Sequence, residues 1–171
     1  MALKKMSPGM KYKLQLIIIY LSAIVFCILW LSDAIAINKR IKQDEMKIVE
    51  YAQSTANALE LYAEHGNDGS WYDGVEYMIR FNTIYSQYIE VRCQQKMFGS
   101  NPTEAERSVS SYAYSISRRM INDPETMKPY AAELSAIMRQ FGNRDPLSDK
   151  NMKHIAEKMS EICSEIEPAI P

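Results

Sequence analysis

The chain has 171 residues, of which 47% are apolar and 24% are charged, and its formal net charge is −1. This length suits one ordinary hydrophobic core. The apolar fraction excludes a mostly disordered chain. The near-neutral charge argues against a basic nucleic-acid-binding domain, so we expect no nucleic-acid partner.

The most strongly apolar part of the sequence is a single block, Leu14 to Ile37. A helix needs about 20 apolar residues to cross the hydrocarbon core of a membrane. Residues 16–31 carry no charge. We therefore expect a transmembrane anchor over residues 14–37, with Tyr20 and Trp30 near the two membrane interfaces. A buried core helix is a less favoured interpretation, because helices of soluble proteins rarely carry such a run.

A signal peptide is the main alternative for this block. Basic residues precede it, and Ala34-Ile35-Ala36 has the small-x-small spacing of a cleavage site. Cleavage near Ala36 would release a secreted protein. The block exceeds the roughly 7–15 apolar residues of most signal peptides, which favours a retained anchor.

The flanking charges predict the orientation of the anchor. The segment before it has no acidic residue and holds four lysines: Lys4, Lys5, Lys11 and Lys13. After the anchor, basic and acidic residues are interleaved. Because positive flanks stay inside, residues 1–13 are expected to form a short basic cytoplasmic tail. Residues 38–47 follow as a juxtamembrane linker or helix extension, and residues 48–171 as an extracytoplasmic domain. The expected location is a bacterial inner membrane, with this domain in the periplasm.

Apolar residues recur at helical spacing through the rest of the chain. The first such segment, 37–65, is expected to stop at Gly66. The second, 71–98, is apolar over most of its circumference, with Gly99 as its end. A helix that is apolar on several sides is buried on several sides, so we expect it to be the central helix of a bundle.

Start signals for helices recur in the C-terminal half. Residues 101–104 (Asn-Pro-Thr-Glu) predict a third helix, with Asn101 as the cap and Glu104 closing a capping box. Asp123-Pro124-Glu125 predicts a fourth helix that ends at Gly142, and Ser148 caps a last one. The expected fold is all-α: a single N-terminal transmembrane helix followed by a compact bundle of four to five helices.

Cys93 and Cys163 lie outside the apolar block. An even cysteine count is what an oxidising compartment permits. A bridge between them would clip the last helix onto the second one, and the alternative is two buried thiols. A disulfide between Cys93 and Cys163 is therefore a hypothesis that depends on the geometry of the bundle.

The sequence contains no phosphate-binding loop, nucleophile elbow or zinc-protease motif. We therefore expect no catalytic residue, no cofactor and no metal. Glu64 and Asp73 flank a Gly-containing turn, but a solvated loop explains them better than glycosidase chemistry does. Charged faces on two helices are the candidate partner contacts: Arg118, Arg119, Glu157, Glu161 and Glu165.

An anchor, a small helical domain and no recognisable chemistry favour a non-catalytic envelope protein that binds another protein. An accessory subunit of a transport or secretion assembly, an inhibitor, and an immunity or exclusion factor all fit this description. The alternative is a helical ligand-binding sensor that works with a membrane partner. A cell-wall-acting enzyme is a more distant third.

Overall fold

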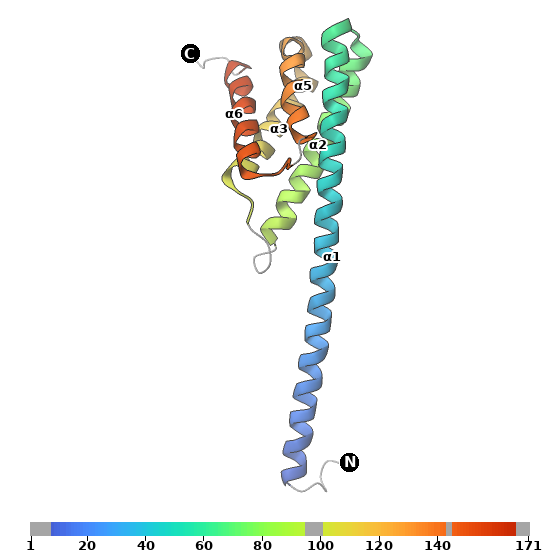
Figure 1. Ribbon diagram of the computed structural model, residues 1–171, viewed down its shortest axis with the longest axis vertical. Helices are drawn as coiled ribbons and strands as arrows, with labels where there is room; N and C mark the ends of the chain where they lie inside the picture. The colour runs from blue at the N-terminus through green and yellow to red at the C-terminus, as the bar shows by residue number, and fades with distance from the viewer. Residues whose placement is uncertain (1–7, 95–100, 143–144, 167–171) are drawn as a thin grey trace. The chain divides into compact units, whose positions relative to one another are not determined.

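The computed structural model describes residues 8–94, 101–142 and 145–166 (Figure 1). Every regular element in these ranges is a helix, so the all-α prediction is confirmed. The chain divides into two compact units, Met1–Arg40 and Ile41–Pro171. We call the second the helical unit.

Helix α1 (Pro8–His65) contains the apolar block. By length and composition this helix can cross a membrane: its most apolar window has a mean hydropathy of 2.6, and none of that window is buried inside the protein. Tyr20 and Trp30 are both exposed. A core helix of a soluble protein would be buried, so the exposure of this apolar window argues against the core-helix interpretation. Residues 38–47 are helical and belong to α1.

Helix α1 ends where the sequence predicts. Gly66 adopts a left-handed φ of 65°, and its N–H donates to the carbonyl oxygen of Tyr62 at 2.7 Å. A glycine is favoured there because it lacks the Cβ that makes this conformation costly. Helix α2 (Asp68–Gln94) begins three residues earlier than predicted, because the side chain of Asn67 accepts from the N–H of Gly69 at 2.9 Å. The predicted end at Gly99 lies outside the described residues.

The prediction that the second helix is the central one is wrong. Helix α3 (Glu104–Asn122) takes this position and packs closely against both α2 and α6 (Asp149–Ile166). Figure 1 shows α3 between them. Large apolar residues at the edges of the buried stripe of α2 remain at the surface instead of meeting a further helix. The stripe itself comprises Trp71, Gly74, Met78, Phe81, Tyr85 and Tyr88.

The capping box of α3 also differs from the prediction. Thr103, and not Asn101, is the cap: its hydroxyl accepts from the N–H of Glu106 at 3.2 Å, and the Glu106 carboxylate accepts from the N–H of Thr103 at 2.6 Å. Both Asn101 and Thr103 precede a glutamate by three residues, so the local pattern is ambiguous. Packing selects Glu106, because its carboxylate also pairs with the Arg92 guanidinium of α2.

The predicted fourth helix is interrupted. It consists of α4 (Pro124–Met127), a 3₁₀ turn η2 (Lys128–Tyr130), α5 (Ala131–Arg139) and a 3₁₀ turn η3 (Gln140–Gly142). Pro129 explains the first interruption, because proline has no N–H to donate to the preceding turn.

The core of the helical unit lies where the end of α1, α2, α3, α5 and α6 meet. Phe81 stacks on Tyr85 with ring centroids 5.5 Å apart and meets the edge of Phe141 at 4.9 Å. Gly74 allows α1 and α2 to approach, because an added Cβ would lie 2.7 Å from a methyl group of Leu59. Side chains from all these helices therefore form one interior.

A polar cluster ties α1, α2 and α3 together at one end of this interior. The Arg92 guanidinium pairs with the buried Glu106 carboxylate and donates to the Tyr88 hydroxyl at 2.9 Å. That hydroxyl donates to Glu45 of α1 at 3.4 Å. Burial raises the pKa of Tyr88 to about 12, so its proton stays in place at neutral pH.

Candidate functional site

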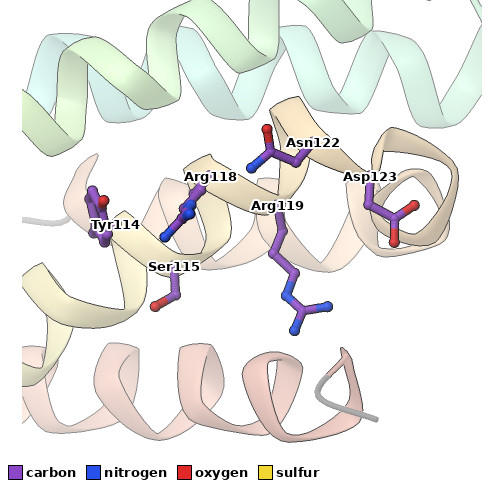
Figure 2. Close-up of a pocket in the computed structure, with 6 residues that line it drawn as sticks. All are labelled: Tyr114, Ser115, Arg118, Arg119, Asn122 and Asp123. Carbon is purple, nitrogen blue, oxygen red and sulfur yellow. The ribbon is translucent and has the colours of Figure 1, made fainter.

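The predicted contact residues Arg118 and Arg119 lie near the end of α3. They line a hollow of about 370 Å³, which Figure 2 shows along the α3 helix. The side chains that line it carry guanidinium, hydroxyl, amide and carboxylate groups: Tyr114, Ser115, Arg118, Arg119, Asn122 and Asp123. Helix α3 contributes five of these residues and its C-cap, Asp123, is the sixth, so the hollow depends mainly on one helix.

The contacts of the two arginines of the hollow differ from those of other arginines in the helical unit. Arg119 donates to the carbonyl oxygen of Ile166 at 3.1 Å, at the end of α6. Within the described ranges, neither Arg118 nor Arg119 forms an ion pair. Other arginines of the helical unit do form ion pairs: Arg80 with Glu76, Arg92 with Glu106, and Arg139 with Glu60. An exposed guanidinium group such as that of Arg118 can bind an anion.

An exposed apolar strip adjoins the hollow. Its four side chains, from α2 and α3, are 39% to 68% exposed: Tyr72, Ile79, Tyr114 and Ile121. The hydroxyl oxygens of Ser86 and Ser110 lie 3.2 Å apart, and Arg92 meets Glu106, so α2 and α3 run antiparallel in register. This register places Ile79 of α2 opposite the stretch of α3 between Tyr114 and Ile121. We call these four residues the α2–α3 strip.

The α2–α3 strip is not among the contacts predicted from the sequence. A signal existed in α3, because Tyr114 and Ile121 are seven residues apart and lie beside its buried stripe. The buried stripe itself includes Val109, Ala113 and Ile116. Apolar residues at this spacing on a polar face indicate a second, unfilled contact surface.

The predicted acidic contacts lie on α6, on a separate surface. Glu157, Glu161 and Glu165 are exposed, and Glu161 pairs with Lys158 of the same helix. In the part of the chain that the structure describes, none of the three pairs with Arg118 or Arg119. The structure does not bring the predicted basic and acidic contacts together.

The predicted disulfide is wrong for this structure, in which the sulfurs of Cys93 and Cys163 are not bonded to each other. The Arg92–Glu106 pair places the end of α2 at the start of α3, whereas the Arg119–Ile166 hydrogen bond places the end of α6 at the end of α3. These two points on α3 are thirteen residues, or about 20 Å, apart. A disulfide requires Cα atoms within about 7 Å.

We therefore expect the wild-type protein to migrate identically on reducing and non-reducing gels of membrane fractions. Alkylation of the denatured chain without reductant should modify both Cys93 and Cys163. A faster non-reducing band that the Cys93→Ser variant abolishes would contradict this arrangement, in which the end of α2 and the end of α6 lie toward opposite ends of α3.

The carboxylates considered for glycosidase chemistry are exposed. Glu64 lies at the end of α1, 3.8 Å from His65, and Asp73 is on the outer side of α2. Among the described residues, no group of three His, Cys, Asp or Glu side chains is arranged to hold a metal ion. Comparison of the chain with family models, curated proteins and solved structures gives no match.

Proposed function

We propose that the chain is a membrane-anchored, non-catalytic protein of the bacterial envelope whose helical unit binds another protein. The observation that supports this proposal best is the α2–α3 strip beside Arg118. Large exposed apolar side chains in a continuous patch are typical of interaction sites. Tyrosine and arginine are the residues that most often dominate binding energy at protein interfaces.

The proposed anchor is residues 14–37 of α1. An exposed window with a mean hydropathy of 2.6 supports it, because such a surface is costly in water and favourable in lipid. The lysines before this segment support a cytoplasmic N-terminus and a periplasmic helical unit. Cleavage near Ala36 remains the competing proposal.

Alkaline carbonate extraction and an intact mass test the anchor together. We expect the chain to stay in the membrane pellet, because the hydrocarbon core holds a spanning helix more firmly than a peripheral contact. Its mass should show that residues 14–36 are retained. A soluble species that begins after Ala36 would contradict the anchor and leave the binding proposal intact.

Affinity purification of the tagged full chain from a detergent extract tests the binding. We expect a second protein in a fixed ratio to the chain. The double variant Ile79→Asp/Ile121→Asp should reduce the recovered partner at least tenfold, which corresponds to about 1.4 kcal/mol. Leu61→Asp is the matched control, because Leu61 is an exposed apolar residue of α1 outside the strip. Equal losses in the double variant and the control would contradict a role for the strip.

A ligand-binding sensor is the second candidate. A hollow of about 640 Å³ supports it, with a largely apolar lining: Lys42, Glu45, Met46, Val49, Asp145, Pro146 and Leu147. This volume is in the range of small-molecule sites. A small molecule that stays with the wild-type protein in native mass spectrometry, but is lost from Met46→Asp, would favour the sensor. Leu61→Asp should retain such a ligand.

A further inference from the structure

Building on the proposed protein binding, we infer that the hollow holding Arg118 and Arg119 receives a carboxylate of the partner. The carboxylate belongs to an amphipathic segment whose apolar side chains cover the α2–α3 strip. The hollow and the strip are continuous, because Tyr114 belongs to both. One segment of a partner can therefore fill both features.

The charge of the hollow favours a carboxylate. Two guanidinium groups and the Asp123 carboxylate line it, which gives a formal charge of +2 − 1 = +1. One carboxylate neutralises this charge, whereas a phosphate dianion would overcompensate it and repel Asp123. A guanidinium fork also matches the two oxygens of a carboxylate. The hydroxyl of Ser115 and the amide of Asn122 add hydrogen-bonding groups around the same space.

The spacing on α3 constrains the arrangement of the partner segment. Tyr114, Arg118 and Ile121 follow one another at four and three residues, so they share one side of the helix. Neighbours at this spacing lie about 5–6 Å apart. A complementary segment therefore places its carboxylate within one helical turn of the apolar side chains that cover Tyr114 and Ile121.

The acidic helix α6 of a second copy is a poor occupant of this site. The acidic face of α6 supplies exposed carboxylates: Glu157, Glu161 and Glu165. Within the described residues, however, α6 exposes no large apolar side chain. It could neutralise Arg118 but would leave the α2–α3 strip uncovered. Helix α6 of a second copy therefore does not fit the site, and we infer a different protein as the occupant.

Site-specific photo-crosslinking in native membranes tests this inference. The full chain carries Tyr114→p-benzoylphenylalanine, and Glu157→p-benzoylphenylalanine on α6 is the control position. We expect the Tyr114 probe to label a partner peptide that has Asp or Glu within one turn of aliphatic or aromatic residues. The control position should not label it.

Charge reversal gives the second arm of the test. Arg118→Glu should reduce the Tyr114 crosslink at least tenfold. Arg107→Glu makes the same change on an exposed part of α3 away from the hollow, and it should leave the crosslink unchanged. Lysine in place of the identified partner carboxylate should restore the crosslink to Arg118→Glu. Equal thermal melts of the two glutamate variants would verify that both fold.

The following outcomes would overturn the inference. A crosslink to phospholipid, to the chain itself, or to a peptide without an acidic residue is inconsistent with it, as is a crosslink that Arg118→Glu does not alter. A partner that Ile79→Asp/Ile121→Asp loses but Arg118→Glu keeps would refute the carboxylate and preserve the proposed function. If no partner is recovered by either method, both proposals fail.

Discussion

Tyr85→Asp is expected to reduce the free energy of unfolding of the helical unit by about 4 kcal/mol. Tyr85 is fully buried, its ring packs against those of Phe81 and Phe141, and its hydroxyl donates to the sulfur of Met152 at 3.4 Å. Burial raises the pKa of the Tyr85 hydroxyl, because this interior disfavours charge. An aspartate there must either bury an unpaired charge or bind a proton.

Thermal melts of the detergent-purified full chain measure this effect. We expect the melting temperature of the Tyr85→Asp variant to fall by more than about 10 °C. Two variants separate charge burial from other causes. Tyr85→Phe removes only a hydroxyl that faces a sulfur, so it should cost less than about 1 kcal/mol. Tyr72→Asp introduces the same charge on the exposed side of α2 and should change stability by about 0.5 kcal/mol or less. A Tyr85→Asp melt within one degree of wild type would contradict the proposed core.

Arg92→Leu should destabilise the helical unit by about 3–5 kcal/mol, because it leaves the Glu106 carboxylate buried without its partner. Glu106 is only 2% exposed. The same substitution removes the hydrogen bond from Arg92 to the Tyr88 hydroxyl. Chemical denaturation monitored by circular dichroism measures the loss.

A double-mutant cycle identifies the cause of this loss. Glu106→Gln removes the charge but keeps a side chain that can close the capping box. The double variant Arg92→Leu/Glu106→Gln should therefore be less destabilised than the sum of the two single changes. Glu60→Gln breaks the exposed pair with Arg139 and should cost less than about 1 kcal/mol. If the loss of unfolding free energy in the double variant equals the sum of the losses in the two single variants, the pairing of Arg92 with Glu106 is contradicted.

Local sequence signals predicted where helices form, but not which other helices pack against each of them. The apolar periods and Gly66 were sufficient to identify the helices and the end of α1, because both depend on near neighbours. The choice between Asn101 and Thr103 as the cap depended on Arg92, which comes from another helix. The position of α2 at one side of the bundle likewise depends on how many helices pack against it.

The candidate site was only partly predictable for the same reason. The position of Arg118 and Arg119 on the polar face of α3 follows from helical periodicity. The sequence does not say which large apolar residues stay uncovered, because Ile79 and Ile121 differ from core residues only in what packs against them. The disulfide prediction failed because the sequence does not show which helix ends lie close together. Cys93 and Cys163 lie toward opposite ends of α3.

The decisive measurement is the native mass of the particle purified with the tagged full chain in mild detergent. The binding proposal predicts one mass equal to this chain plus a different protein in a fixed ratio. The mass of that second protein should be absent from particles of the Ile79→Asp/Ile121→Asp variant. A wild-type particle that contains only one chain, or only copies of this chain, would contradict the proposal.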